Sequence, residues 1–150
     1  MTTPALERFL TYRLHVINKI TDRDTNRAYL EDCGIPLGEA RCLAAIGRYA
    51  PLSVNDLALA ANLNKGQASR SAQALVERGL IEKKESAADG RGVLSLTPAG
   101  DVHYRRIIDL IARRNQEIFG CLSADEQRQL GDMLDRLIAH QRDPSGARED

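Results

Sequence analysis

The chain lacks an excess of charge of either sign. Its 150 residues carry 21 lysines and arginines against 21 aspartates and glutamates, so the formal net charge is zero. A protein held to nucleic acid by bulk charge alone needs a basic excess. The balance excludes that mode of binding, and any nucleic-acid site in this chain must be a local patch.

Long hydrophobic runs are missing as well. No apolar run reaches the roughly 20 residues that a membrane-spanning helix needs. The first ten residues, MTTPALERFL, lack the charged start and apolar stretch of a signal peptide. We therefore expect a cytoplasmic protein with no membrane partner.

Cysteine and histidine are scarce and scattered. Cys33, Cys42 and Cys121 are odd in number, widely spaced and free of any CxxC motif, which argues against a disulfide framework or a zinc site. We expect all three to be small core residues in a reducing compartment, with a thiol switch as the alternative. The three histidines show no metal-ligand spacing, so no metal is predicted.

Catalytic signatures are also absent. The chain contains no GxSxG, HExxH, P-loop or GxGxxG motif. We therefore predict neither an enzyme nor a bound cofactor. A chain of this length is long enough for one domain with a real core.

What the sequence does contain is helical periodicity in six segments, which predicts a mainly α-helical fold. The first helix is expected from Pro4 to about Cys33, and its polar stretch 21–26 fits either a kink or a wet helix face. The others are expected over 38–50 and from about residues 54, 65, 98 and 124. Helix caps are predicted at Ser53, Asn64, Thr97 and Ser123.

The fourth of these helices has two unlike sides. One side carries the apolar residues Ala68, Ala72, Leu75 and Val76, which we expect to be buried. After the stop at Gly79, two short strands are predicted over 80–85 and 92–97, joined through the turn pair Asp89 and Gly90. Two short helices followed by a two-stranded hairpin form a winged helix-turn-helix.

The other side of the same helix is polar and suits a DNA major groove. Arginine pairs with guanine, glutamine with adenine, and serine with base or phosphate. The hairpin offers further cations to the backbone or to a minor groove. The alternative is a solvated polar helix beside an ordinary hairpin, since residues 64–91 carry only two net positive charges. The candidate DNA-binding residues are Lys65, Gln67, Ser69, Arg70, Gln73, Lys83, Lys84 and Arg91.

Residues 53–100, SVNDLALAANLNKGQASRSAQALVERGLIEKKESAADGRGVLSLTPAG, resemble the MarR family of bacterial transcription regulators. The resemblance rests on Leu57-Ala58, on the stretch from Leu75 to Gly79-Leu80-Ile81, and on Leu96-Thr97 with Gly100. It also rests on an Asp-x-Arg pair in the wing, Asp89 and Arg91, in which Asp89 would position the wing. The chain departs from the family pattern at Lys83, where arginine is common. The order of six helices and one wing extends the likeness over nearly the whole chain.

The resemblance implies a homodimer that binds a pseudo-palindromic operator in double-stranded DNA, with repression as the common mode. A DNA-binding lobe would span 36–97, dimerisation helices 4–33 and 98–141, and a polar tail 142–150. Two recognition helices would then lie about one DNA turn, ~34 Å, apart. The dimer interface would contain Leu6, Phe9, Leu10, Ile118, Phe119, Leu122, Leu130, Met133, Leu134 and Leu137.

The resemblance also implies release from DNA by a small phenolic effector or aromatic carboxylate. Candidate ligand-binding residues are His15, Arg41, Tyr49 and Tyr104. His15 is the leading candidate, because it lies within an apolar run where an imidazole could receive a carboxylate or ring hydroxyl. The alternatives are that His15 is a satisfied core or interface histidine and that Tyr104 is a packing residue. Two rival functions stay open. One is a cysteine-redox-sensing regulator of the same fold, and the other is a winged-helix adaptor that binds protein.

Overall fold

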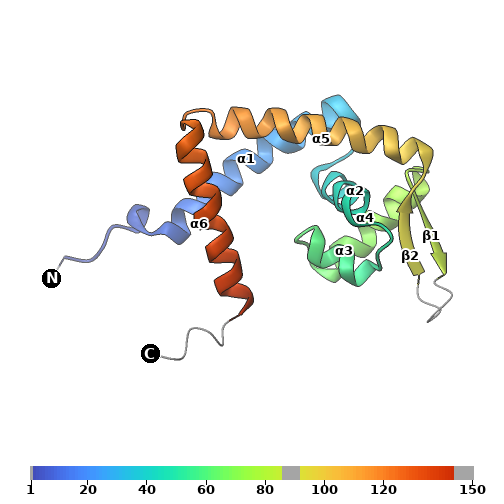
Figure 1. Cartoon of the computed structure of the whole chain (residues 1–150), viewed down its shortest axis with the longest axis horizontal. Helices are drawn as coiled ribbons and strands as arrows, with labels where there is room; N and C mark the ends of the chain where they lie inside the picture. The colour runs from blue at the N-terminus through green and yellow to red at the C-terminus, as the bar shows by residue number, and fades with distance from the viewer. Residues whose placement is uncertain (1, 86–91, 144–150) are drawn as a thin grey trace. The chain divides into compact units, whose positions relative to one another are not determined.

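The computed structural model describes residues 2–85 and 92–143 (Figure 1). The chain divides into two compact units, Met1–Ala112 and Arg113–Asp150. Mostly helical, it has one two-stranded antiparallel sheet, so the predicted fold class of six α-helices with a β-wing is confirmed for the described residues. The elements are η1 (Leu6–Arg8), α1 (Leu10–Cys33), α2 (Leu37–Tyr49), α3 (Val54–Ala60), α4 (Lys65–Glu77), β1 (Ile81–Glu85), β2 (Gly92–Leu96), α5 (Pro98–Phe119) and α6 (Ala124–Arg142).

The start of the first helix differs from the prediction. Phe9 is extended, with φ −71° and ψ 134°, and separates the short 3₁₀ helix η1 from α1. The predicted helix from Pro4 is therefore wrong, because its first turn does not continue into the second. The polar stretch 21–26, in contrast, stays helical without interruption. There the Thr21 hydroxyl donates to the carbonyl of Ile17 at 2.7 Å, so this side chain is satisfied within the helix.

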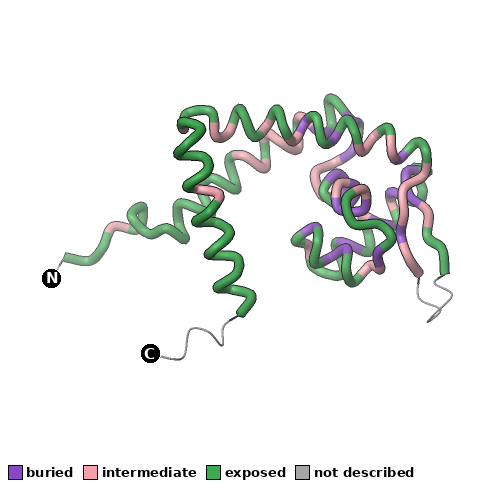
Figure 2. Tube along the Cα trace, viewed as in Figure 1, coloured by how far each residue is buried: buried purple, intermediate pink, exposed green. Residues whose placement is uncertain are grey.

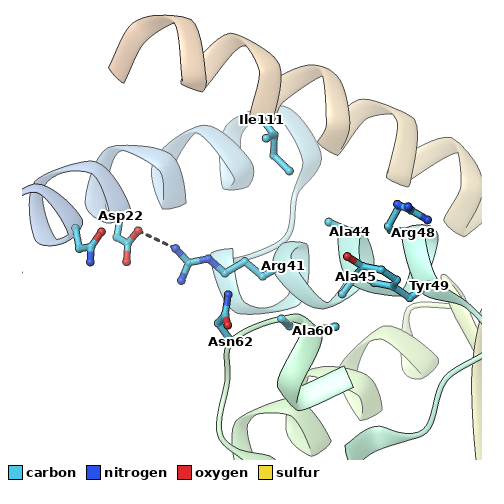
Figure 3. Close-up of a pocket in the computed structure, with 11 residues that line it drawn as sticks. Asp22, Arg41, Ala44, Ala45, Arg48, Tyr49, Ala60, Asn62 and Ile111 are labelled. Atoms are coloured by element: carbon cyan, nitrogen blue, oxygen red, sulfur yellow. Dashed lines mark hydrogen bonds and ion pairs between the residues drawn. The ribbon is translucent and has the colours of Figure 1, made fainter. Parts of the chain in front are cut away.

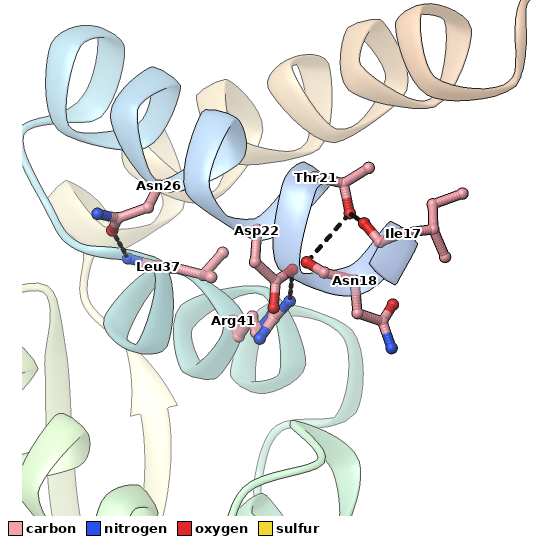
Figure 4. Close-up of polar contacts among 7 residues, drawn as sticks. All are labelled: Ile17, Asn18, Thr21, Asp22, Asn26, Leu37 and Arg41. Atoms are coloured by element: carbon pink, nitrogen blue, oxygen red, sulfur yellow. Dashed lines mark hydrogen bonds and ion pairs between the residues drawn. The ribbon is translucent and has the colours of Figure 1, made fainter. Parts of the chain in front are cut away.

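The junction of α1 and α2 is fixed by backbone and side-chain hydrogen bonds. α1 ends at Gly34, whose left-handed φ of 71° suits a residue without Cβ, and whose N–H donates to the carbonyl of Leu30. The side-chain oxygen of Asn26 accepts from the backbone N–H of Leu37 at 2.9 Å (Figure 4). That bond satisfies one free N–H at the start of α2 and ties it to α1.

The core of the first unit lies among α2, α3, α4, the strands and α5. Buried positions concentrate on these elements (Figure 2). The fully buried side chains include Leu43, Ile46, Leu57, Leu75, Ile81, Leu94 and Ile107. Burying one such aliphatic side chain contributes roughly 1.5–3 kcal/mol, so this cluster is the main source of stability.

The segment from Asn64 to Gly79 forms as predicted, except that one side chain is not buried. Asn64 and Gln67 make a capping box at the start of α4, and Gly79 follows its end with φ 74°. Ala68, Ala72 and Leu75 are buried. Val76 was predicted to join them, but it is 37% exposed, because it lies at the edge of the apolar stripe, which faces α2 and α3.

The wing is attached to the lobe at its base. β1 and β2 pair in antiparallel register from Ile81 opposite Leu96 to Glu85 opposite Gly92. Leu94 also exchanges two backbone hydrogen bonds with Leu52, at 2.8 and 3.3 Å, which fastens the hairpin to the segment before α3. The buried side chains of Ile81 and Leu94 complete the attachment.

One threonine joins three elements at the end of the wing. The Thr97 hydroxyl donates to the carbonyl of Gly79 at 2.6 Å and accepts from the backbone N–H of Gly100 at 3.0 Å. The N–H of Thr97 donates to the carbonyl of Leu80. Gly100 packs directly against that same Leu80 carbonyl, leaving no room for a Cβ. The end of α4, the base of the wing and the start of α5 are thereby connected.

The second unit contains the last turns of α5 and all of α6. A capping box starts α6, as predicted: the N–H of Glu126 donates to the Ser123 hydroxyl at 3.1 Å, and the N–H of Ser123 donates to the Glu126 carboxylate at 2.9 Å. The bond from the Ser123 backbone lowers the pKa of Glu126. α6 buries none of its side chains in this chain. In the described ranges, no helix is long and apolar enough to cross a membrane.

We expect Gly100→Ala to lower the free energy of unfolding by about 1–3 kcal/mol, because the added methyl group overlaps the Leu80 carbonyl and forces the backbone apart. Urea unfolding followed by circular dichroism measures the loss. Gly38→Ala is the matched control, since its Cβ would meet the Ser71 hydroxyl at an ordinary 3.5 Å. Equal stability of the two variants would show that Gly100 is not a close contact.

Candidate nucleic-acid interface and ligand pocket

The polar side of α4 is available for binding. All five of its predicted DNA-binding side chains are exposed, while the opposite side of the helix is buried. The helix therefore presents one continuous hydrophilic surface, here called the reading face. It consists of Lys65, Gln67, Ser69, Arg70 and Gln73.

Two of the five side chains on the reading face also hydrogen bond within their own helix. The Gln67 carbonyl oxygen accepts from the Asn64 N–H at 3.2 Å as half of the capping box. The Gln73 amide donates to the Glu77 carboxylate at 3.3 Å. The Arg70 guanidinium lies beside Gly66, one turn back toward the helix start. Gln67 keeps both amide N–H donors, which are the groups that base-edge acceptors require.

Of the three wing residues predicted to contact DNA, two lie within the described residues. Lys83 and Lys84 on β1 are exposed, and Lys84 forms an ion pair with Glu82 at 3.1 Å. Both ends of this pair are largely solvated, so it holds Lys84 only weakly. The predicted backbone contact Arg91 and the predicted wing-positioning residue Asp89 lie outside the described residues.

The far end of α4 is held by an ion pair that sequence reasoning missed. Arg78, at the C-cap of α4, donates from Nε to the Glu39 carboxylate at 2.8 Å. Glu39 is only 7% exposed, so loss of Arg78 would leave a buried carboxylate without its ion-pair partner. The two residues are 39 positions apart, and no local pattern in the sequence signals their contact.

A cavity of about 470 Å³ lies in the first unit beside α2 (Figure 3). Residues from α1, α2, the end of α3, the α3–α4 turn and α5 line it: Asn18, Asp22, Arg41, Ala44, Ala45, Arg48, Tyr49, Ala60, Ala61, Asn62 and Ile111. Two of the four predicted ligand-binding residues, Arg41 and Tyr49, are among them. A ligand here would touch the turn that leads into the reading face.

The other two predicted ligand-binding residues are not part of this cavity. His15 is exposed on α1, so its interpretation as a core histidine is wrong for this chain. Tyr104 packs its ring against Gly47, which has no room for a Cβ. What the prediction missed is the α1 contribution. Asn18 and Asp22 are four residues apart on one helix face, a spacing that the sequence does display.

The cavity has a polar and an apolar side. Asp22 binds Arg41, with 2.8 Å between Oδ1 and Nη2 (Figures 3 and 4). The Arg48 guanidinium lies 5.1 Å from the centre of the Tyr49 ring. With two guanidinium groups and one carboxylate, the lining carries one net positive charge. Small apolar surface from Ala44, Ala45 and Ile111 completes a site that suits a small anion with an apolar body.

Large apolar side chains are exposed outside the core. They include Leu10, at 71%, on α1 and Leu137, at 52%, on α6. The other predicted interface residues are exposed or half-buried, and none of them is buried. Large exposed apolar patches on a protein surface mark interaction sites. Within the described residues, no group of three or more histidine, cysteine, aspartate or glutamate side chains could hold a metal ion.

Comparisons with known proteins find transcriptional regulators. The family model described as MarR family matches residues 34–92, which span the end of α1 to the wing. The HTH-type transcriptional regulator BilQ of Clostridium symbiosum is 29% identical over 112 residues, or 74% of this chain and 78% of BilQ.

Solved structures share the fold over nearly the whole chain. A MarR family transcriptional regulator from Silicibacter pomeroyi superposes with a TM-score of 0.81 and 27% identity, covering 92% of this chain and 93% of that one. The MepR–DNA complex of S. aureus gives a TM-score of 0.77 at 20% identity, covering 91% of this chain and 99% of that one. The winged helix-turn-helix architecture is therefore common to all of them.

The cysteines correct one prediction. Cys33 and Cys42 are buried as expected, but Cys121, at the turn before α6, is exposed. Burial raises the pKa of the Cys42 thiol to about 11, against a smaller lowering by a hydrogen bond with Ser71. A thiol of that kind is protonated at neutral pH and is a poor nucleophile, so Cys42 is unsuited to redox sensing.

We expect a maleimide to label Cys121 rapidly in the native protein and to leave Cys42 unlabelled until the chain unfolds. The reason is that Cys42 is buried and its thiol is protonated at neutral pH. Because burial raises the pKa of this thiol from 9.0 to about 11, its contribution to stability is lost as the pH rises through that range. Peptide mass spectrometry with and without denaturant measures both sites. Labelling of Cys42 as fast as Cys121 at pH 7 would contradict the assignment.

Proposed function

We propose that the chain is a regulator of the MarR type, which its matches resemble, and that it is a cytoplasmic repressor that binds a pseudo-palindromic operator as a homodimer and is released by a small aromatic acid. The observation that carries this proposal is the two-sided character of α4. One side is buried in the lobe, and the other presents five polar side chains to solvent.

The reading face has the chemistry of a major-groove helix. Arg70 supplies the forked donor that guanine O6 and N7 accept, and Gln67 and Gln73 supply amides for adenine. The first backbone N–H groups of α4, at Lys65 and Gly66, have no carbonyl partner four residues earlier in the helix, so a phosphate would be stabilised there. A similarly folded protein, MepR, has been solved with DNA, which supports the same mode of binding here.

Dimerisation would cover the exposed apolar surface. The predicted dimerisation segments, 4–33 and 98–141, carry Leu6, Phe9 and Leu10 at one end and Met133, Leu134 and Leu137 at the other, all exposed in the single chain. Burial of such surface contributes about 25 cal/mol per Å², which favours association. A two-fold axis would then place two reading faces about one DNA turn, ~34 Å, apart.

The cavity beside α2 is the proposed effector site. Its net positive lining favours an acid, and its small apolar side chains leave room for a ring. An effector releases DNA only if it binds one state of the protein better than another. The cavity meets that requirement in principle, because Ala60 ends α3, and Ala61 and Asn62 belong to the turn that precedes α4.

We expect Arg70→Ala to weaken operator binding by about 1–3 kcal/mol and to relax the base preference at one position of each half-site, because the variant loses a bidentate contact with guanine. Fluorescence anisotropy with operator and scrambled duplexes measures both effects. Arg23→Ala is the matched control, since it removes an exposed arginine from α1. Unchanged operator affinity in Arg70→Ala would remove this residue from the interface.

A salt titration separates this proposal from a protein-binding adaptor. Binding through phosphates releases counterions, so log K falls linearly with log salt with a slope of about −0.9 for each phosphate neutralised. An apolar protein contact lacks that dependence. A flat response would favour the adaptor interpretation of the same fold.

We expect Leu137→Glu to convert the dimer into monomers and to reduce operator affinity at the same protein concentration, because a charge would be buried in an apolar interface. Analytical ultracentrifugation measures the mass. Leu59→Glu is the control for oligomeric state, since Leu59 is exposed on α3 outside the predicted interface. A wild-type chain that sediments as a monomer would refute the dimer.

A further inference from the structure

One arginine of the cavity lining, Arg41, already forms an ion pair with a carboxylate of the protein itself. Asp22 on α1 and Arg41 on α2 are joined at 2.8 Å, and both are lining residues (Figures 3 and 4). Their side chains are 43% and 42% exposed, so solvent and small solutes reach both. An ion pair this exposed contributes little net stability and can be replaced by a rival anion.

We propose that Asp22 is a built-in competitor of the acid effector for Arg41, and thereby the residue that sets the affinity and charge selectivity of the cavity. This inference rests on the proposed effector site. A ligand carboxylate and the Asp22 carboxylate both require the Arg41 guanidinium. An anion without an apolar group would not displace Asp22 from Arg41. An aromatic acid would displace it, because its ring gains apolar contacts that Asp22 does not make.

The surroundings of the ion pair support an exchange of this kind. Asn18 lies one helical turn before Asp22, and its amide can donate to a carboxylate from the same side. Arg48, over the Tyr49 ring, keeps a second positive charge on the lining. Ala44, Ala45 and Ile111 offer apolar surface for a ring. The site therefore holds an anion at one end and an apolar group at the other.

The exchange would also alter how α1 is joined to α2. The side-chain bonds that link these helices near the cavity include those from Asp22 to Arg41 and from Asn26 to the N–H of Leu37 (Figure 4). An effector that takes Arg41 removes the first and leaves the second. The ligand then has different contacts in the two states, which is the condition for it to shift their populations.

The test compares benzoate with benzamide, which share a ring and differ in charge. Isothermal titration calorimetry is run on the full chain as wild type, Asp22→Asn and the control Asp24→Asn. Asp24 lies on α1, does not line the cavity, and its loss removes the same charge. We expect Asp22→Asn to bind benzoate roughly fivefold tighter or more, with benzamide unchanged. Arg41→Gln is expected to lose the preference for benzoate over benzamide.

Each of the following calorimetric results would overturn the inference: a benzoate gain in Asp24→Asn equal to that in Asp22→Asn, an equal gain for benzamide, or no benzoate binding by wild type and Asp22→Asn alike. Operator binding is measured on the same preparations by anisotropy. If the benzoate pattern holds but no preparation binds duplex DNA, the regulatory function fails and the competitor role stands. If benzoate releases the operator equally from wild type and Asp22→Asn, only the competitor role fails.

Discussion

Close packing of the alanine side of α4 is the constraint on which the rest of the structure depends. Ala68 and Ala72 are 0% and 5% exposed, and side chains this small let the helix approach α2 and α3 closely. The close approach buries Leu75 and leaves every larger polar residue of α4 on the opposite side. A wider helix spacing would lose the contacts among Leu43, Leu57 and Leu75, and with them the fixed direction of the reading face.

Features that depend on a few neighbouring residues could be predicted from the sequence. The capping boxes at Asn64 and Ser123 need only the cap and the residue three positions on, and both are confirmed. The helix order and the wing followed from period and turn residues. The break at Phe9 was missed, because the apolar pattern on its two sides continues without a stop signal and nothing local excludes a helix there.

Features that depend on distant residues could not be predicted in the same way. The Glu39–Arg78 and Asp22–Arg41 pairs join residues 39 and 19 positions apart, and periodicity says which face of a helix is apolar without saying what it meets. For the same reason Val76 and Cys121 were expected to be buried. Of the ligand-site candidates, Arg41 and Tyr49 line the cavity and His15 does not, since α1 turns Asn18 and Asp22 toward α2 instead.

The hydroxyl of Thr97 has a mechanical consequence. It bonds to Gly79, just past the end of α4, and to the first turn of α5, and the base of the wing is held between them. Thr97 is the single residue between the end of β2 at Leu96 and the start of α5 at Pro98. Ile111, three turns farther along α5, forms part of the wall of the cavity. α5 is therefore one uninterrupted helix that connects the wall of the cavity to the base of the wing.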